Sequence, residues 1–154
     1  MAKYYTNQKH GGSALSASLS ISGMDEYLAK IKAAGNSIEE ACKAAVNAAT
    51  PIVEADMKLG AARHRKGVGE YGTDTVYNAI ESTPAEVKGP GVSATVGIDT
   101  EKHPEAAHAV FQEYGDGHSP EFPDPFIRPA MDNNRSKIKA TMKKVLKKWG
   151  VPIE

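Results

Sequence analysis

The sequence predicts an α+β domain in which a small antiparallel sheet of three or four strands packs against a long alanine-rich helix and a C-terminal amphipathic helix. Three observations predict this class. Apolar residues alternate with serines over residues 15–22, which is typical of a half-buried strand. Alanine recurs at helical spacing over residues 38–59. Apolar residues then step by three or four along residues 127–149, the clearest periodicity in the chain.

Length and composition are those of one globular domain. The chain has 154 residues, of which 40% are hydrophobic and 25% charged. Its 19 basic and 19 acidic residues give a formal net charge of zero, which argues against a generic nucleic-acid or membrane binder. No apolar run approaches the roughly 18 residues of a membrane span, and the N-terminus lacks the apolar stretch of a signal peptide. We expect a flexible arm at residues 1–13, a single domain at residues 14–150, assembly in a cytoplasm and no membrane partner.

In the first half of the chain, the predicted strand ends at Gly23, and residues 24–34 are expected to form a short helix with its acids in the first turn. A second helix begins after Asn36 or Ser37, either of which can cap it, and runs to Leu59. Pro51 lies inside this helix and removes one backbone donor. We therefore expect a kink near Asn47.

In the middle of the chain, residues 60–74 hold four glycines and the basic cluster 63–66, and they predict a long mobile loop. Residues 75–83 fit either a short helix or a strand, and we favour the helix. Residues 85–98 predict a hairpin that turns at residues 89–91. One face of its second strand is apolar, through Val92, Ala94, Val96 and Ile98.

The final third predicts an extended segment, a proline-rich corner and the last helix. Residues 106–114 are expected to be a strand, with a helical start as the alternative. Prolines at 123, 125 and 129 fix three φ angles and push the residues before them toward extended conformations. Phe122 and Phe126 are expected to anchor this corner in the core. The last helix runs from Ile127 to Trp149, with Pro129 in its first turn and Gly150 after its end.

No catalytic or metal-binding motif stands out. The histidines lack the spacing of an HExxH site, and no GxSxG or complete phosphate-binding loop occurs. The single cysteine, Cys42, lies on the apolar stripe of the second helix and is expected in the core. We expect no enzyme activity, no metal, no cofactor and no small-molecule substrate. A small hydrolase or nuclease is the alternative, and it would use the carboxylates clustered in sequence at Glu113, Asp116, Glu121 and Asp124.

Charge is distributed unevenly along the chain. Residues 135–148 hold seven basic residues and no acid, whereas residues 1–132 hold 12 basic and 18 acidic residues, a net of −6. A solvated helix face with cations near a helix C-terminus is the simplest interpretation. The functional interpretation is that the basic helix is an electrostatic surface for a complementary subunit or for DNA. A DNA-binding accessory protein that uses this helix and residues 63–66 is therefore the alternative, although no aromatic residues interleave with the lysines.

Two short motifs carry a resemblance. Residues 110–115 read VFQEYG, and after a proline-rich gap residues 125–130 read PFIRPA and lead into the lysine-rich helix. This arrangement resembles the tail-completion or neck family of long-tailed bacteriophages and prophages, proteins of the head–tail junction and minor tail components. The order of the upstream elements fits as well, from residue 15 to residue 148. Residues 73–80 depart from the family pattern, with Asp74 where glycine is common and Ala79 where serine is common.

The resemblance implies a virion structural protein without enzyme activity, located in the tail or neck and in the host cytoplasm during assembly. It implies a ring of identical copies, with head–tail connector and tail proteins as partners and no duplex DNA contact. The residues expected to determine the fold of the corner are Tyr114, Gly115, Pro125, Phe126 and Pro129. Those expected to touch a partner are Glu113, Arg128, Lys143, Lys144 and Lys147.

Overall fold

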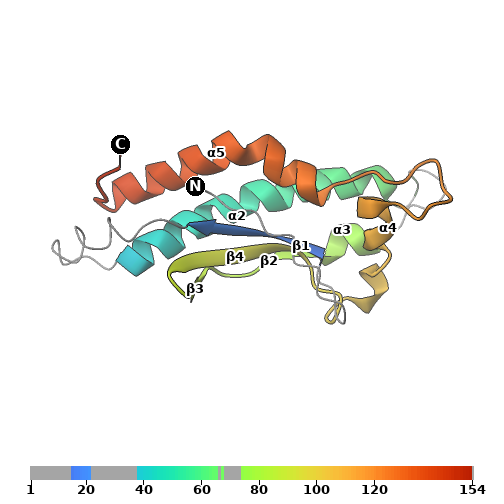
Figure 1. Ribbon diagram of the computed structural model, residues 1–154, viewed down its shortest axis with the longest axis horizontal. Coiled ribbons are helices and arrows are strands. Elements are labelled where there is room, and N and C mark those ends of the chain that lie inside the picture. Colours follow the sequence, from blue (N-terminus) through green and yellow to red (C-terminus); the bar gives the residue numbers. More distant parts are fainter. Residues whose placement is uncertain (1–14, 22–37, 66, 68–73, 154) are drawn as a thin grey trace.

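A sheet and a pair of long helices form the two layers of the protein (Figure 1). The computed structural model describes residues 15–21, 38–65, 67 and 74–153. The expected arm at residues 1–13 and the expected helix at residues 24–34 lie outside these residues. In chain order the elements are β1 (Leu15–Ile21), α2 (Ile38–Ala61), η1 (Ala62–His64), α3 (Thr75–Ala79), β2 (Ile80–Ser82), β3 (Glu86–Lys88), β4 (Gly91–Ile98), η2 (Pro104–Ala106), α4 (Ala109–Tyr114) and α5 (Ile127–Lys148).

The sheet is antiparallel and is built around β4. Strand β1 pairs with β4 along its whole length, from Leu15 opposite Ile98 to Ile21 opposite Val92. Strands β2 and β3 share the other edge of β4, β2 at its C-terminal end and β3 at its N-terminal end. Between β2 and β3 the ladder is continued by Thr83, whose N–H donates to the carbonyl of Thr95 at 2.8 Å. The predicted α+β class, the first strand and the hairpin are confirmed.

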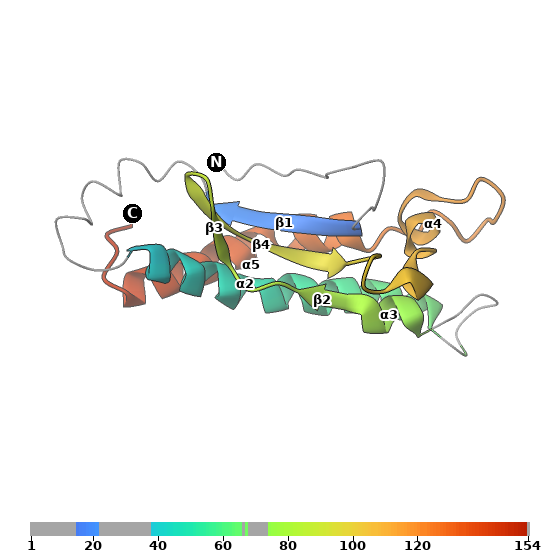
Figure 2. The same cartoon turned by 90° about the horizontal axis from the view of Figure 1, so that it is seen from below.

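Helices α2 and α5 lie side by side, run in opposite directions and cover one face of the sheet (Figures 1 and 2). The alanines of α2 keep that helix close to its neighbours, and Ala45, Val46 and Ala49 are fully buried. Helix α2 runs through Pro51 without a break. Proline lacks the N–H that would bond the carbonyl of Asn47, and the hydroxyl of Thr50 donates to that carbonyl instead, at 3.1 Å. This bond helps α2 to accommodate Pro51.

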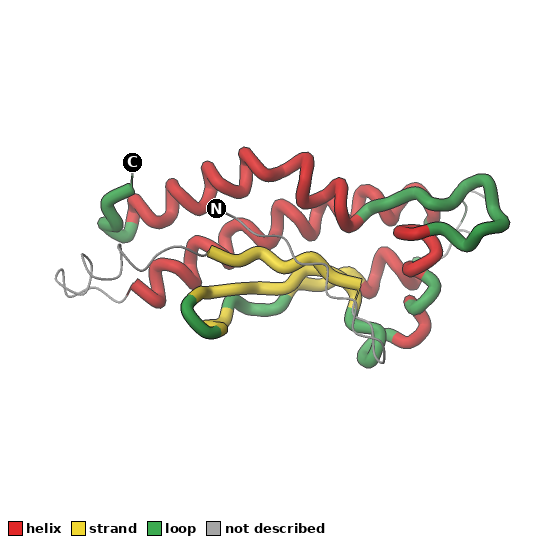
Figure 3. The backbone as a smooth tube through the Cα atoms, viewed as in Figure 1, coloured by secondary structure: helices red, strands yellow, loops and turns green. Residues whose placement is uncertain are grey.

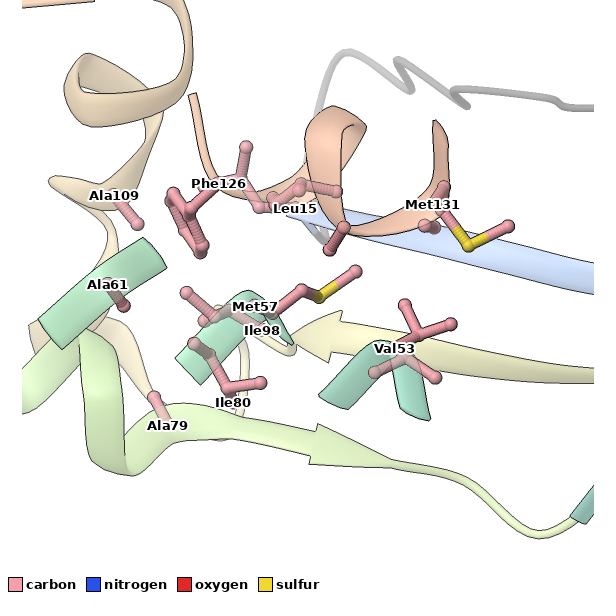
Figure 4. Packing of buried hydrophobic residues seen from close by; sticks show 14 of the residues in the cluster. Leu15, Val53, Met57, Ala61, Ala79, Ile80, Ile98, Ala109, Phe126 and Met131 are labelled. Carbon is pink, nitrogen blue, oxygen red and sulfur yellow. The ribbon is translucent and has the colours of Figure 1, made fainter. Parts of the chain in front are cut away.

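Two clusters of buried apolar residues fill the space between the layers. The larger one lies toward the start of α5 and contains Phe126, Met57, Ile80 and Ile98 (Figure 4). The smaller one joins the N-terminal half of α2 to the end of α5. Cys42 lies in this second cluster as predicted, and burial raises the pKa of its thiol. The expected apolar face of β4 is also buried.

The segment before the corner is helical, so the prediction of a strand at residues 106–114 is wrong. Helices η2 and α4 occupy it (Figure 3). The buried residues Ala106, Ala109, Gln112 and Glu113 recur every three or four positions, as on one face of a helix. A strand would bury every second residue instead. The corner therefore joins two helices.

Two other segments differ in part from expectation. Residues 75–83 are neither all helix nor all strand, because α3 ends at Ala79 and β2 begins at Ile80. Within the predicted loop at residues 60–74, residues 60 and 61 belong to α2 and residues 62–64 form η1, while residues 66 and 68–73 lie outside the described residues. The last helix has the expected position.

Candidate functional site

Glu113 of α4 is fully buried, and its carboxylate caps the N-terminus of α5. Its Oε2 accepts hydrogen bonds from the backbone N–H groups of Phe126 and Ile127, both at 2.9 Å. Its Oε1 accepts from the backbone N–H of Arg128 at 3.3 Å. The first N–H groups of a helix lack partners inside the helix and carry partial positive charge, so a carboxylate suits them. One side chain of α4 thus holds the start of α5.

Arg128 balances the charge of the buried carboxylate. Its Nε donates to Oε1 of Glu113 at 3.0 Å, and a terminal nitrogen donates to the backbone carbonyl of Glu113 at 3.4 Å. The Arg128 side chain is 52% exposed, whereas that of Glu113 is 1% exposed. The guanidinium also lies 5.3 Å from the centroid of the Tyr114 ring, within cation–π range. A buried carboxylate is stable only when it is paired and hydrogen-bonded, and here both conditions hold.

Asp124 ties the corner to the end of α2 and to η1. Its carboxylate accepts from Nε of Arg63 at 2.7 Å and from a terminal nitrogen of Arg63 at 2.6 Å. The same carboxylate lies 2.8 Å from Nε2 of His64. The hydrogen bond from Arg63, with a smaller contribution from His64, lowers the pKa of Asp124 in spite of its partial burial. The basic cluster that predicted a mobile loop is, at these two residues, part of a fixed contact.

The loop that leads into the corner is closed by Asp116. Its carboxylate accepts from the backbone N–H groups of His118 and Ser119 at 2.9 and 2.8 Å, and from the Ser119 hydroxyl at 2.6 Å. These bonds lower the pKa of Asp116 to about 2, with the hydroxyl as the largest cause. Asp116 is therefore ionised at neutral pH and organises the turn.

Apolar contacts complete the corner. Phe126 is buried in the larger cluster and lies against Gly60 of α2, where an added Cβ would be only 2.6 Å from the Cβ of Phe126. Gly115 ends α4 with a φ of 91°, a conformation that other residues rarely adopt. Its N–H donates to the carbonyl of Phe111 at 2.7 Å. Pro125 and Pro129 are half-buried beside these contacts.

Of the residues expected to touch a partner, Glu113 is placed differently by the structure. Its side chain is enclosed, so the expectation that it contacts another protein is corrected, and its observed contact is internal. Its acceptor oxygens are engaged by α5, which also argues against its use as a general acid or base. Tyr114, expected to be a fold determinant, is 42% exposed and contacts Arg128 at the surface. The sequence signal that could have located Glu113 inside is the helical spacing of the apolar residues before it.

The basic residues of α5 lie mainly on its exposed surface. Lys144 and Lys147 are exposed and Lys143 is half-buried. Within the described part of the chain, no carboxylate lies within 4.0 Å of Lys137, Lys139, Lys144, Lys147 or Lys148. Arg135, by contrast, pairs with Asp132 at 2.7 Å. The lysines near the end of α5 thus form a cationic surface.

Neither a metal-ion site nor a membrane-spanning helix occurs among the residues that the structure describes. No three His, Cys, Asp or Glu side chains there are grouped so that they could hold a metal ion. No helix in that part of the chain combines the length and the apolar character needed to cross a membrane.

Comparison with known proteins returned no relative. No family model, no curated protein and no solved structure matches this chain.

Proposed function

We propose that this chain is a virion structural protein of a tailed bacteriophage or prophage, and that it acts in tail completion or head–tail joining. In this role copies of the chain form a ring that contacts connector and tail proteins. The proposal rests first on the two motifs at residues 110–115 and 125–130 and on the order of the elements around them.

One observation supports it most directly. The two motifs lie ten residues apart in sequence, and Glu113 of the first accepts hydrogen bonds from three consecutive N–H groups that begin at Phe126 of the second. This contact accounts for the presence of both motifs in one chain, because the first supplies the cap for the helix that begins in the second. A helix held in one direction by such a corner lets identical subunits repeat the same contact around a ring.

Deletion of the gene from the phage or prophage genome that carries it tests the proposal. We expect heads and tails that remain unjoined or incomplete in electron micrographs, and restoration by the gene supplied in trans. We also expect the chain in purified wild-type particles by mass spectrometry. Particles that lack the chain and still assemble and infect normally contradict the proposal.

A second candidate, a DNA-binding accessory protein, is favoured by one observation, the cationic surface near the end of α5. A gel shift with duplex DNA separates the two functions. The virion proposal expects no useful affinity at physiological salt. Tight binding that falls steeply with salt, and that is lost when Lys144 and Lys147 are changed to Glu, would favour the DNA-binding candidate instead.

A further inference from the structure

The two ends of the molecule carry opposite charge. Helix α4 and the loops around it lie at one end of the long axis, and the last turns of α5 lie at the other (Figure 1). Residues 99–124, at the α4 end, contain seven acidic residues and one lysine. Two of these acids are paired with arginines, Glu113 with Arg128 and Asp124 with Arg63, and the negative charge of this end comes from the others. Lys144, Lys147 and Lys148 are exposed at the α5 end. We call these the acidic end and the basic end.

Much of this charge is not neutralised by ion pairs among the residues that the structure describes. At the acidic end, Glu101 and Glu121 are exposed, and the described residues place no cationic side chain within 4.0 Å of either. At the basic end, the neighbouring carboxylates of Glu39 and Glu40 already pair with Lys43, at 2.7 and 3.3 Å. Among the described residues, the three lysines therefore have no carboxylate partner within 4.0 Å, and they are available to a carboxylate of another copy.

Both ends also expose large apolar side chains. Val110, Phe111 and Tyr114 on α4 are 38%, 50% and 42% exposed, and their spacing places them on one side of the helix. Trp149, directly after α5, is 44% exposed. Aromatic residues surrounded by charged ones are the usual composition of a protein–protein contact, in which the aromatic residues supply most of the energy. The apolar groups are an observation independent of the charges, and they lie on α4 and directly after α5, at the same two ends of the molecule.

We propose that copies of this chain associate head to tail, with the basic end of one copy seated on the acidic end of the next. Trp149 then packs against Phe111 and Tyr114, while the lysines of α5 face Glu101 and Glu121. The two surfaces lie at opposite ends, so they cannot meet within one copy. A contact between two different surfaces of identical subunits propagates, and it closes into a ring when the rotation between neighbours allows. The inference deepens the proposed function and rests on it for the ring, whereas the contact itself is a property of the chain.

Charge reversal in purified full-length protein tests the electrostatic half of the contact. One variant carries Lys144→Glu with Lys147→Glu, and a second carries Glu101→Lys with Glu121→Lys. All four side chains are exposed, so both variants are expected to fold, and circular dichroism checks this. By sedimentation velocity, we expect wild-type association that weakens between about 50 mM and about 500 mM NaCl. We expect each variant alone to associate at least about tenfold more weakly.

The equimolar mixture of the two variants is the decisive sample. The first variant places two carboxylates opposite the unchanged Glu101 and Glu121 of the next copy, and the second places two ammonium groups opposite the unchanged Lys144 and Lys147. Each variant therefore repels itself at the contact and attracts the other. Association that returns in the mixture supports the head-to-tail contact. Association that stays lost in the mixture overturns it, and so does a wild-type chain that remains monomeric at about 0.5 mM and low salt. A variant with Lys137→Glu and Lys139→Glu is the matched control, because these lysines lie about 10 Å from Lys144 and Lys147 along the helix. It should associate like the wild type.

The apolar side chains of the proposed contact are tested separately. Trp149→Ser and Phe111→Ser should each weaken association at least about tenfold, and by the same factor at low and at high salt. No effect of either substitution contradicts the proposed packing. These measurements are made on purified protein and the deletion experiment on particles, so failure of the contact and failure of the virion role are distinguishable.

Discussion

At the scale of single residues, the structure uses its buried carboxylate to begin a helix. Phe126, at the start of α5, has no side chain that could cap the helix, and the cap comes from Glu113, 13 residues earlier. Charge-assisted hydrogen bonds to a buried group contribute more than neutral ones because little water competes for them. The stability of the corner should therefore depend on the charge of Glu113 as well as on its shape.

We predict that Glu113→Gln destabilises the protein by about 2 kcal/mol. Glutamine has nearly the same shape, but it presents one acceptor oxygen in place of two and it removes the negative charge that Arg128 pairs with. Urea denaturation followed by circular dichroism measures the change in the free energy of unfolding. Glu121→Gln, at an exposed carboxylate of the same loop, is the control and should stay within about 0.5 kcal/mol of the wild type. Equal stability of the two variants would contradict a capping role for Glu113.

Asp124 should make stability depend on pH in the acid range. Its pKa is lower in the folded state than in the unfolded chain, where the ordinary value is 3.8, because Arg63 and His64 hydrogen-bond to the ionised form. The contribution is therefore present above pH 3.8 and is lost as the pH falls through the lower folded value. We predict that Asp124→Asn is less stable than the wild type at pH 6 and that the difference narrows below about pH 4. Because Asp124 is 30% exposed, we expect a difference of no more than about 1 kcal/mol. A difference that is the same at pH 6 and pH 3 would contradict this account.

At the scale of elements, the sequence predicts the segments that are formed by local patterns. It does not predict the segments whose structure depends on contacts with residues far away in the chain. Strands β1 and β4 and helix α5 each bury a face at a regular local spacing, so their sequences predict them. Helix α4 was predicted as a strand because Val110, Phe111 and Tyr114 are residues that favour strands, and they lie on its exposed side. Its helical character is set by what the opposite side packs against. The spacing of Ala106 and Ala109 places Glu113 on the buried side of a helix, but the sequence does not predict its hydrogen-bond partners, because these N–H groups come from the next helix.

The contact between α2 and the corner provides an element-scale prediction. Replacing glycine by alanine inside a helix normally stabilises by about 1 kcal/mol. At Gly60 the added methyl would lie 2.6 Å from the Cβ of Phe126, an atom next to the backbone that cannot turn away. Overpacking of this kind costs about 1–3 kcal/mol, so we predict that Gly60→Ala is destabilising by thermal and urea denaturation. Ser136→Ala on the exposed side of α5 is the control and should leave stability unchanged or slightly higher. A Gly60→Ala variant more stable than the wild type would show that α5 moves away easily.

At the scale of the whole molecule, the two long helices are joined at both ends by different means. At the acidic end the corner clamps them through Glu113, Asp124 and Phe126. At the basic end, the described residues join them through the smaller apolar cluster, which includes Ile38, Cys42 and Leu146. Between these ends, fully buried residues of α2 face the sheet. Because polar clamps and buried side chains resist local opening, stability should vary along the molecule.

Native-state hydrogen exchange should reveal this variation. We predict the slowest exchange for amides in the buried middle of α2 and in β4, the central strand, because these open only when the whole domain unfolds. Strand β3 should exchange faster by several orders of magnitude, since its three residues are all exposed and it pairs with β4 over three positions only. The matched comparison is β2, which also spans three residues at the same edge but buries Ile80 beneath it. If β2 exchanges more slowly than β3, burial controls opening at this edge. Equal rates in β2, β3 and β4 would mean that the sheet opens as one unit.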